Sequence, residues 1–311
     1  MNLTNTPYDD VFRTLLNDCS QLIIPVINEV FREHYTGQEK IIFFPNEHFL
    51  NQQEGNERER ITDTCFEILG SEAKKYHWEC QSSTDNSMLV RFFEYDTQIA
   101  LDQGEIIDSV LTVTFPHSAV LFLRGNSKDP CTMKTRMVTP GGSVEYDIHI
   151  MQLQRYGLED IFKNHLLFLI PFYIFSHESR FQEYEENESR LAMLKQEYET
   201  IRNKLGELLE QGMINEYTKC TIIDMSNKVL EHIAVNYDSV KKGVQSVMGG
   251  KVLEYEAKTI KNEGRKEGRK EGRLQILFDL VHDGLLSVTD AASKAKLPED
   301  VFKEEMRMYR R

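Results

Sequence analysis

Long apolar runs are missing from this sequence. The longest, LLFLIPFYIF at 166–175, contains Pro171 and falls well short of the roughly 20 apolar residues that a membrane-spanning helix needs. We therefore expect a core segment there. The first residues, MNLTNTPYDDVFRTLL, lack the basic start and the apolar stretch of a signal peptide. These absences predict a cytoplasmic protein without a membrane partner.

Paired cysteines are missing as well. The cysteines are odd in number, widely spaced and without a CxxC pair: Cys19, Cys65, Cys80, Cys131 and Cys220. Secreted disulfide frameworks and cysteine zinc sites both need such pairs. We therefore expect free thiols in a reducing compartment.

Positive charge is scarce. The 37 Lys and Arg residues are outnumbered by 50 Asp and Glu residues, which gives a net charge of -13. Such a chain repels nucleic acid at long range, so a nucleic-acid partner would require a local basic patch or bridging cations. The apolar share of 40% and the length of 311 residues predict a globular body with an appended unit.

Apolar spacing alternates between helical and strand periods in the first half of the chain. Helical spacing broken at Pro25 predicts one kinked helix or two short ones over residues 7–35, and it returns over 85–103. The remaining segments have the pattern of strands: 40–83, including a hairpin; 109–123, buried around Pro116; and 135–151, a hairpin with its turn at 140–142. We predict a mixed α/β body over residues 1–177.

The second half has no strand pattern. Residues 178–262 predict a helical arm, either a hairpin or a coiled-coil-like arrangement, and EGRKEGRKEGR at 263–273 predicts a solvated helical linker. Residues 274–311 predict a three-helix tail with the spacing of a helix-turn-helix motif. The third of these helices is acidic, which makes it a poor surface for a DNA groove.

Polar side chains interrupt two of the expected strands. Asp63 lies in RITDTCFEIL, and Glu79 and Gln81 share one face of KKYHWECQSS. If these strands form a hairpin, Asp63 and Glu79 can meet at one end of the sheet. With the main-chain carbonyl of Cys80 they would form an all-oxygen set suited to Mg²⁺ or Mn²⁺.

This Asp…Glu-x-Gln pattern resembles the PD-(D/E)xK nuclease superfamily, in which Asp and Glu bind the metal and a third residue, usually Lys, helps position the attacking water. More closely, the chain resembles the recombination-promoting nuclease and putative transposase family. The resemblance covers roughly residues 5–177 and the tail. The matching features are YDDVFRTLL with Asp9, Phe12 and Arg13, ITDTCFEI, WECQ, MLVRFFEYDTQI with Arg91 and Tyr95, and the Glu-Gly-Arg-Lys repeat.

The resemblance implies a restriction-endonuclease-like mixed sheet flanked by helices and a Mg²⁺-dependent endonuclease that hydrolyses DNA phosphodiesters. In that scheme Asp63 and Glu79 hold the metal and Gln81 positions water. Asp9 and Arg91 assist, with Arg91 contacting the phosphate or pairing with Glu79. Gln81 stands where Lys is usual, and a neutral amide orients water without lowering its pKa through positive charge.

Plainer interpretations remain open for each of these residues. Asp63 and Glu79 could be a cross-strand pair on a solvated face, and Asp9 could simply favour a helix N-terminus. His77 is expected to be a packing or surface histidine, and Asp96 a solvated helical charge. The competing function is a non-catalytic protein on a decayed nuclease fold, assembling into a homo-oligomer through the helical arm.

Overall fold

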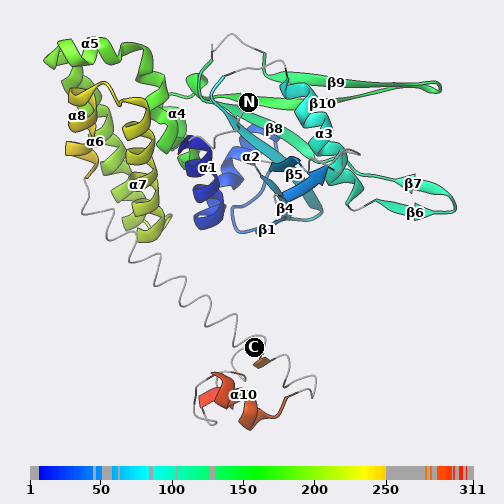
Figure 1. Ribbon diagram of the computed structural model, residues 1–311. Helices are drawn as coiled ribbons and strands as arrows, with labels where there is room; N and C mark the ends of the chain where they lie inside the picture. Colours follow the sequence, from blue (N-terminus) through cyan, green and yellow to red (C-terminus); the bar gives the residue numbers. More distant parts are fainter. Residues whose placement is uncertain are drawn as a thin grey trace. The chain divides into compact units, whose positions relative to one another are not determined.

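A computed structural model shows a mixed α/β body followed by further helices (Figure 1). Residues up to Lys251 form one compact unit, and Val252–Arg311 form a second. The structure describes the following residues: 7–44, 47–50, 58–61, 64–83, 87–102, 104–125, 130–249, 277–278, 281, 286–295, 297, 301–303 and 306.

The described part of the chain starts with two short helices rather than one kinked helix. Helix α1 spans Pro7–Asp18, and α2 spans Ile23–Phe31 after a 3-10 turn at Ser20–Leu22. The break therefore precedes Pro25, which lies in the first turn of α2. Proline is tolerated there because the first N–H groups of a helix have no intrahelical acceptor.

A six-stranded sheet in the order β1-β4-β5-β8-β10-β9 forms the centre of the first unit. Strand β5 pairs antiparallel with β4 and parallel with β8, and β10 pairs parallel with β8 and antiparallel with β9. The hairpin predicted within 40–83 is confirmed as β4–β5, and the hairpin predicted at 135–151 is confirmed as β9–β10. The strands are β1 Lys40–Phe43, β4 Cys65–Leu69, β5 Ala73–Gln81, β8 His117–Phe122, β9 Thr132–Thr139 and β10 Gly142–Gln152.

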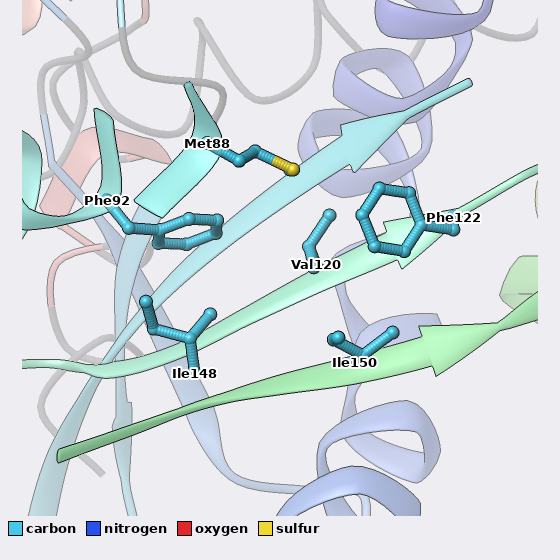
Figure 2. Close-up of a cluster of buried hydrophobic side chains, with 6 residues drawn as sticks. All are labelled: Met88, Phe92, Val120, Phe122, Ile148 and Ile150. Atoms are coloured by element: carbon cyan, nitrogen blue, oxygen red, sulfur yellow. The ribbon is translucent and has the colours of Figure 1, made fainter. Parts of the chain in front are cut away.

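Helices cover both faces of this sheet. Helix α3, Met88–Leu101, places Met88 and Phe92 against apolar side chains of β8 and β10 (Figure 2). On the opposite face, Phe31 of α2 packs against Tyr76 and Trp78 of β5. The helical spacing of 85–103 therefore reflects one buried stripe, as expected.

Two smaller pairs of strands lie outside the main sheet. Strands β2 (Glu47–Leu50) and β3 (Arg58–Ile61) pair with each other. Strands β6 (Glu105–Ile107) and β7 (Val110–Thr112) form an exposed hairpin (Figure 1) whose turn residues both have positive φ, as a two-residue hairpin turn requires. The prediction that 109–123 is buried throughout is wrong for β7 and right for β8.

The apolar run at 166–175 is a core segment, as predicted. All of it but Leu166 belongs to the 3-10 helix η3, Leu167–Arg180. Helix α7 (Glu216–Ile233) and helix α1 both pack against η3. The remaining helices of this unit are α4 Leu158–Lys163, α5 Phe181–Glu186, α6 Glu188–Glu210 and α8 Asp238–Met248. No helix in the described part of the chain is long and apolar enough to cross a membrane.

The second unit contains α10, Val288–Ala295, preceded by Ser287, whose hydroxyl accepts from the backbone N–H of Asp290. Ala291 and Ala292 pack with Leu277, Phe278 and Phe302 in a small apolar core. The linker predicted at 263–273 and most of the third tail helix lie outside the described residues.

Candidate functional site

The site is built on strand β5, whose successive side chains point to opposite faces of the sheet. His77 contacts Phe92 and Tyr95 of α3, so the odd-numbered side chains of the strand face that helix. Glu79 and Gln81 follow on the same face, and the Gln81 amide donates to Oε2 of Glu79 at 3.3 Å. The prediction that Glu79 and Gln81 share a face is confirmed.

Glu79 is the centre of this site although it is only 2% exposed. Its Oε2 accepts a second, charge-assisted hydrogen bond from the guanidinium of Arg91, one turn into α3, at 3.0 Å. Of the two roles expected for Arg91, pairing with Glu79 is therefore the one seen. Arg91 is 25% exposed and Gln81 is partly exposed, so these two residues lie between Glu79 and solvent.

Two residues expected to play no part belong to the same cluster. Asp96 is fully buried rather than solvated, and it accepts hydrogen bonds from Nδ1 of His77 and from the hydroxyl of Ser118. His77 is also fully buried, with Nε2 lying 3.7 Å from Oε1 of Glu79. The expectation for Asp96 is wrong because α3 turns this position towards the sheet.

A sequence signal for these residues existed. Asp96 lies four residues after Phe92 and three before Ile99, which are spacings of the buried stripe of α3. His77 has the same strand parity as Glu79. Ser118 could not have been found in this way, because only the parallel pairing of β5 with β8 places it beside His77.

Asp63, the other expected metal ligand, lies outside the described residues. Its neighbour Thr64 is described, and the Thr64 carbonyl accepts from the N–H of Trp78 at 2.9 Å. The β4–β5 register pairs Cys65 with His77 and Phe66 with Tyr76. The antiparallel pairing therefore extends at least to Thr64 and Trp78, close to Glu79.

The main-chain carbonyl of Cys80 has a direction that follows from its neighbours. The Gln81 carbonyl accepts from the N–H of Leu123 on the β8 side, and successive residues of a strand direct their carbonyls to opposite edges. The Cys80 carbonyl is therefore directed to the β4 side, where Thr64 meets Trp78.

Asp9 lies in the first turn of α1, a helix that contacts β5. The neighbouring ring of Tyr8 lies 5.9 Å from that of Phe175, over which the guanidinium of Arg124 lies at 4.8 Å. The backbone N–H of Arg124 in turn bonds the Ser82 carbonyl, just after β5. These contacts connect the start of α1 with the end of β5, and the assisting role of Asp9 stays a prediction.

Lys74 and Lys75 do not substitute for Gln81. Lys74 pairs with Glu33 at 2.6 Å, and the ammonium of Lys75 lies over the ring of Phe44. Both are near the start of β5, about 20 Å along the strand from Gln81 at 3.3 Å per residue. The third position of the pattern is therefore a neutral amide.

Cys65 pairs with His77 in the sheet. Burial raises the pKa of its thiol to about 12, so the free thiolate is scarce at neutral pH. Among the described residues, no group of three or more His, Cys, Asp or Glu side chains is arranged to hold a metal ion. A complete metal site would therefore need a further ligand.

Comparisons with family models, with curated proteins and with solved structures gave no match for this chain. The geometry around Glu79 therefore carries the functional argument together with the sequence motifs.

Proposed function

We propose that this protein is a Mg²⁺-dependent endonuclease that hydrolyses DNA phosphodiester bonds on a restriction-endonuclease-like fold. The observation that carries the proposal is the convergence of Gln81 and Arg91 on the buried carboxylate of Glu79. A mixed sheet with helices on both faces is compatible with that fold. The motif resemblance supplies the reaction class.

Asp63 is proposed as the second carboxylate ligand. In the antiparallel β4–β5 ladder, Cys65 lies opposite His77 and Phe66 lies opposite Tyr76. If this register continued by two residues, Asp63 would lie opposite Glu79. With the Cys80 carbonyl directed to this side, the proposed donors are all oxygen atoms, which fits Mg²⁺ better than a softer metal.

Bound Mg²⁺ would stabilise the charge that grows on the scissile phosphate and activate a water molecule. The remaining work falls to side chains of this chain. Gln81 lies at the open end of the cluster, where its amide can orient the attacking water. A positive charge at the phosphate also offsets the repulsion between DNA and a chain of net charge -13.

Arg91 has two consecutive roles in this scheme. Without metal, its guanidinium neutralises the buried carboxylate of Glu79, which would otherwise be costly to keep charged. With a divalent cation held at Glu79, the guanidinium of Arg91, already partly exposed, would be available to bind the DNA phosphate, for which its planar fork is well suited.

The test is cleavage of supercoiled plasmid DNA by the purified full chain with Mg²⁺. We expect Glu79→Ala and Asp63→Ala to slow cleavage at least about 100-fold, because loss of a residue that merely supports a metal ligand already costs 10- to 100-fold. Glu145→Ala is the control, since this exposed carboxylate lies on the β9–β10 hairpin. Wild-type rates in both site variants would remove the assignment.

The alternative is a non-catalytic interaction protein. Two observations favour it: the near-complete burial of Glu79, and the exposed apolar residues of the β6–β7 hairpin, where Ile106 is 74% and Val110 61% exposed. Exposed apolar patches are typical of protein interfaces. Calorimetric titration with Mn²⁺ separates the two functions, because absence of binding at millimolar metal would favour the alternative.

A further inference from the structure

Behind Glu79 lies a chain of polar side chains that the scheme above does not use. Nδ1–H of His77 donates to Oδ1 of Asp96 at 2.7 Å, and the Ser118 hydroxyl donates to the same oxygen at 2.8 Å. Nε2 of His77 lies 3.7 Å from Oε1 of Glu79. The side chains come from β5, α3 and β8, and none is more than 2% exposed.

This chain is not what stability alone would favour at this place. Beside it on the same face, Val120 of β8 and Ile148 of β10 pack against α3 in an apolar cluster. Well-packed apolar side chains are often as stabilising as a buried ionic group or more so. The polar chain therefore calls for a different explanation, and its contact with Glu79 offers one.

The imidazole of His77 is held in one orientation. Asp96 fixes it through Nδ1, and the rings of Phe92 and Tyr95 lie against it with centroids 4.9 and 5.9 Å away. Its Nε2 edge is thereby aimed at Oε1 of Glu79. The guanidinium of Arg91 donates to the other oxygen, Oε2, at 3.0 Å, so the imidazole and the guanidinium flank the Glu79 carboxylate.

We propose that His77, oriented by Asp96 and Ser118, is a positioning residue that fixes the Glu79 carboxylate for metal binding. The inference rests on the proposed function. Residues that orient metal ligands without touching the metal typically account for a 10- to 100-fold difference in metal affinity. Asp96 and Ser118 act through His77, and His77 acts through Glu79.

The experiment measures Mn²⁺ affinity of the full-length protein by calorimetry, with thermal unfolding recorded alongside. We expect His77→Ala and Asp96→Ala to weaken binding 10- to 100-fold. Asp96→Asn should retain most of the affinity, because its amide oxygen can still accept from Nδ1–H. An Asp96→Asn loss as large as that of Asp96→Ala would overturn the positioning role, since it would assign the effect to charge.

Trp78→Phe is the matched control. Trp78 lies between His77 and Glu79 in the chain and is equally buried, but it faces α2. We expect Trp78→Phe to leave Mn²⁺ affinity unchanged even where it lowers the melting temperature. Equal losses of affinity in Trp78→Phe and His77→Ala would assign the effect to general destabilisation and overturn the inference.

Ser118→Ala keeps the inference testable if the alanine variants at 77 and 96 do not fold. It removes one hydrogen bond to Asp96, and a smaller but measurable loss of Mn²⁺ affinity is expected. If the wild type binds Mn²⁺ and cleaves DNA but Ser118→Ala binds Mn²⁺ equally well, the inference is overturned and the proposed function stays intact. A wild type that binds no Mn²⁺ would overturn both.

Discussion

The two faces of strand β5 are equally buried but chemically opposite. On one face Tyr76 and Trp78 pack against Phe31 of α2. On the other, His77 and Glu79 are enclosed by α3 with polar partners. Burying a large aromatic side chain stabilises the fold by a few kcal/mol, whereas burying polar groups costs free energy unless they are hydrogen-bonded.

The same strand therefore serves two purposes. The aromatic face fixes β5 against α2, so the strand does not depend on its polar face for its position. The polar face can then hold groups whose arrangement matters for chemistry. Changes on the aromatic face should therefore alter stability first, and changes on the polar face should alter metal binding first.

The largest effect is expected for Trp78→Ala. Trp78 is fully buried, and removing a buried Trp or Phe side chain typically costs about 3–5 kcal/mol because a cavity remains. Urea denaturation followed by circular dichroism would measure the loss. A loss below about 1 kcal/mol would show that the aromatic face does not anchor the strand.

A smaller effect of opposite sign is expected for Arg91→Ala. The guanidinium competes with the metal for Oε2 of Glu79, so its removal should strengthen Mn²⁺ binding by about tenfold. A neighbouring charge at this distance changes the affinity of a carboxylate for a proton by a similar factor. Plasmid cleavage should nevertheless slow, because the phosphate loses its arginine. Calorimetry and cleavage assays of the same protein preparation would measure both.

Arg136→Ala provides the comparison for Arg91→Ala. Arg136 also pairs with a glutamate, Glu145, but on the exposed β9–β10 hairpin. Exposed pairs of this kind contribute little, so neither metal affinity nor cleavage should change. Weaker Mn²⁺ binding in Arg91→Ala would contradict the role assigned to Arg91.

The smallest effect concerns thiol reactivity on the two faces. Cys65 lies opposite His77 on the polar face, Cys80 lies on the aromatic face, and both are buried, whereas Cys131 is exposed. Burial raises the pKa of the Cys65 thiol to about 12, so its reactive thiolate is scarce. A thiol-specific reagent at pH 8 should label Cys131 well before Cys65 or Cys80.

Mass spectrometry after partial labelling would rank the three thiols. Labelling of Cys65 ahead of Cys80 would show that the polar face opens more readily than the aromatic one, since opening must precede reaction. Labelling of Cys80 ahead of Cys65 would reverse the comparison and argue against the aromatic anchor.

Local patterns predicted much of the site because they depend on neighbours in the chain. Strand parity placed Glu79 and Gln81 together. Helical spacing predicted a helix over 85–103, and α3 spans Met88–Leu101. The expectation for Asp96 was wrong because it followed the charge of the side chain, whereas its position in the stripe of α3 indicated the core. The location of Asp63 relative to Glu79 stays a prediction.

The alternation of side chains along β5 and the buried stripe of α3 follow from backbone geometry within one element, so the order of residues was enough to predict both. The packing of α3 over the face with Glu79, and the contact of Ser118 of β8 with Asp96, are seen only in the folded chain. Those contacts join residues far apart in the chain. They depend on which elements pack together to bury the most apolar surface, which no local pattern specifies.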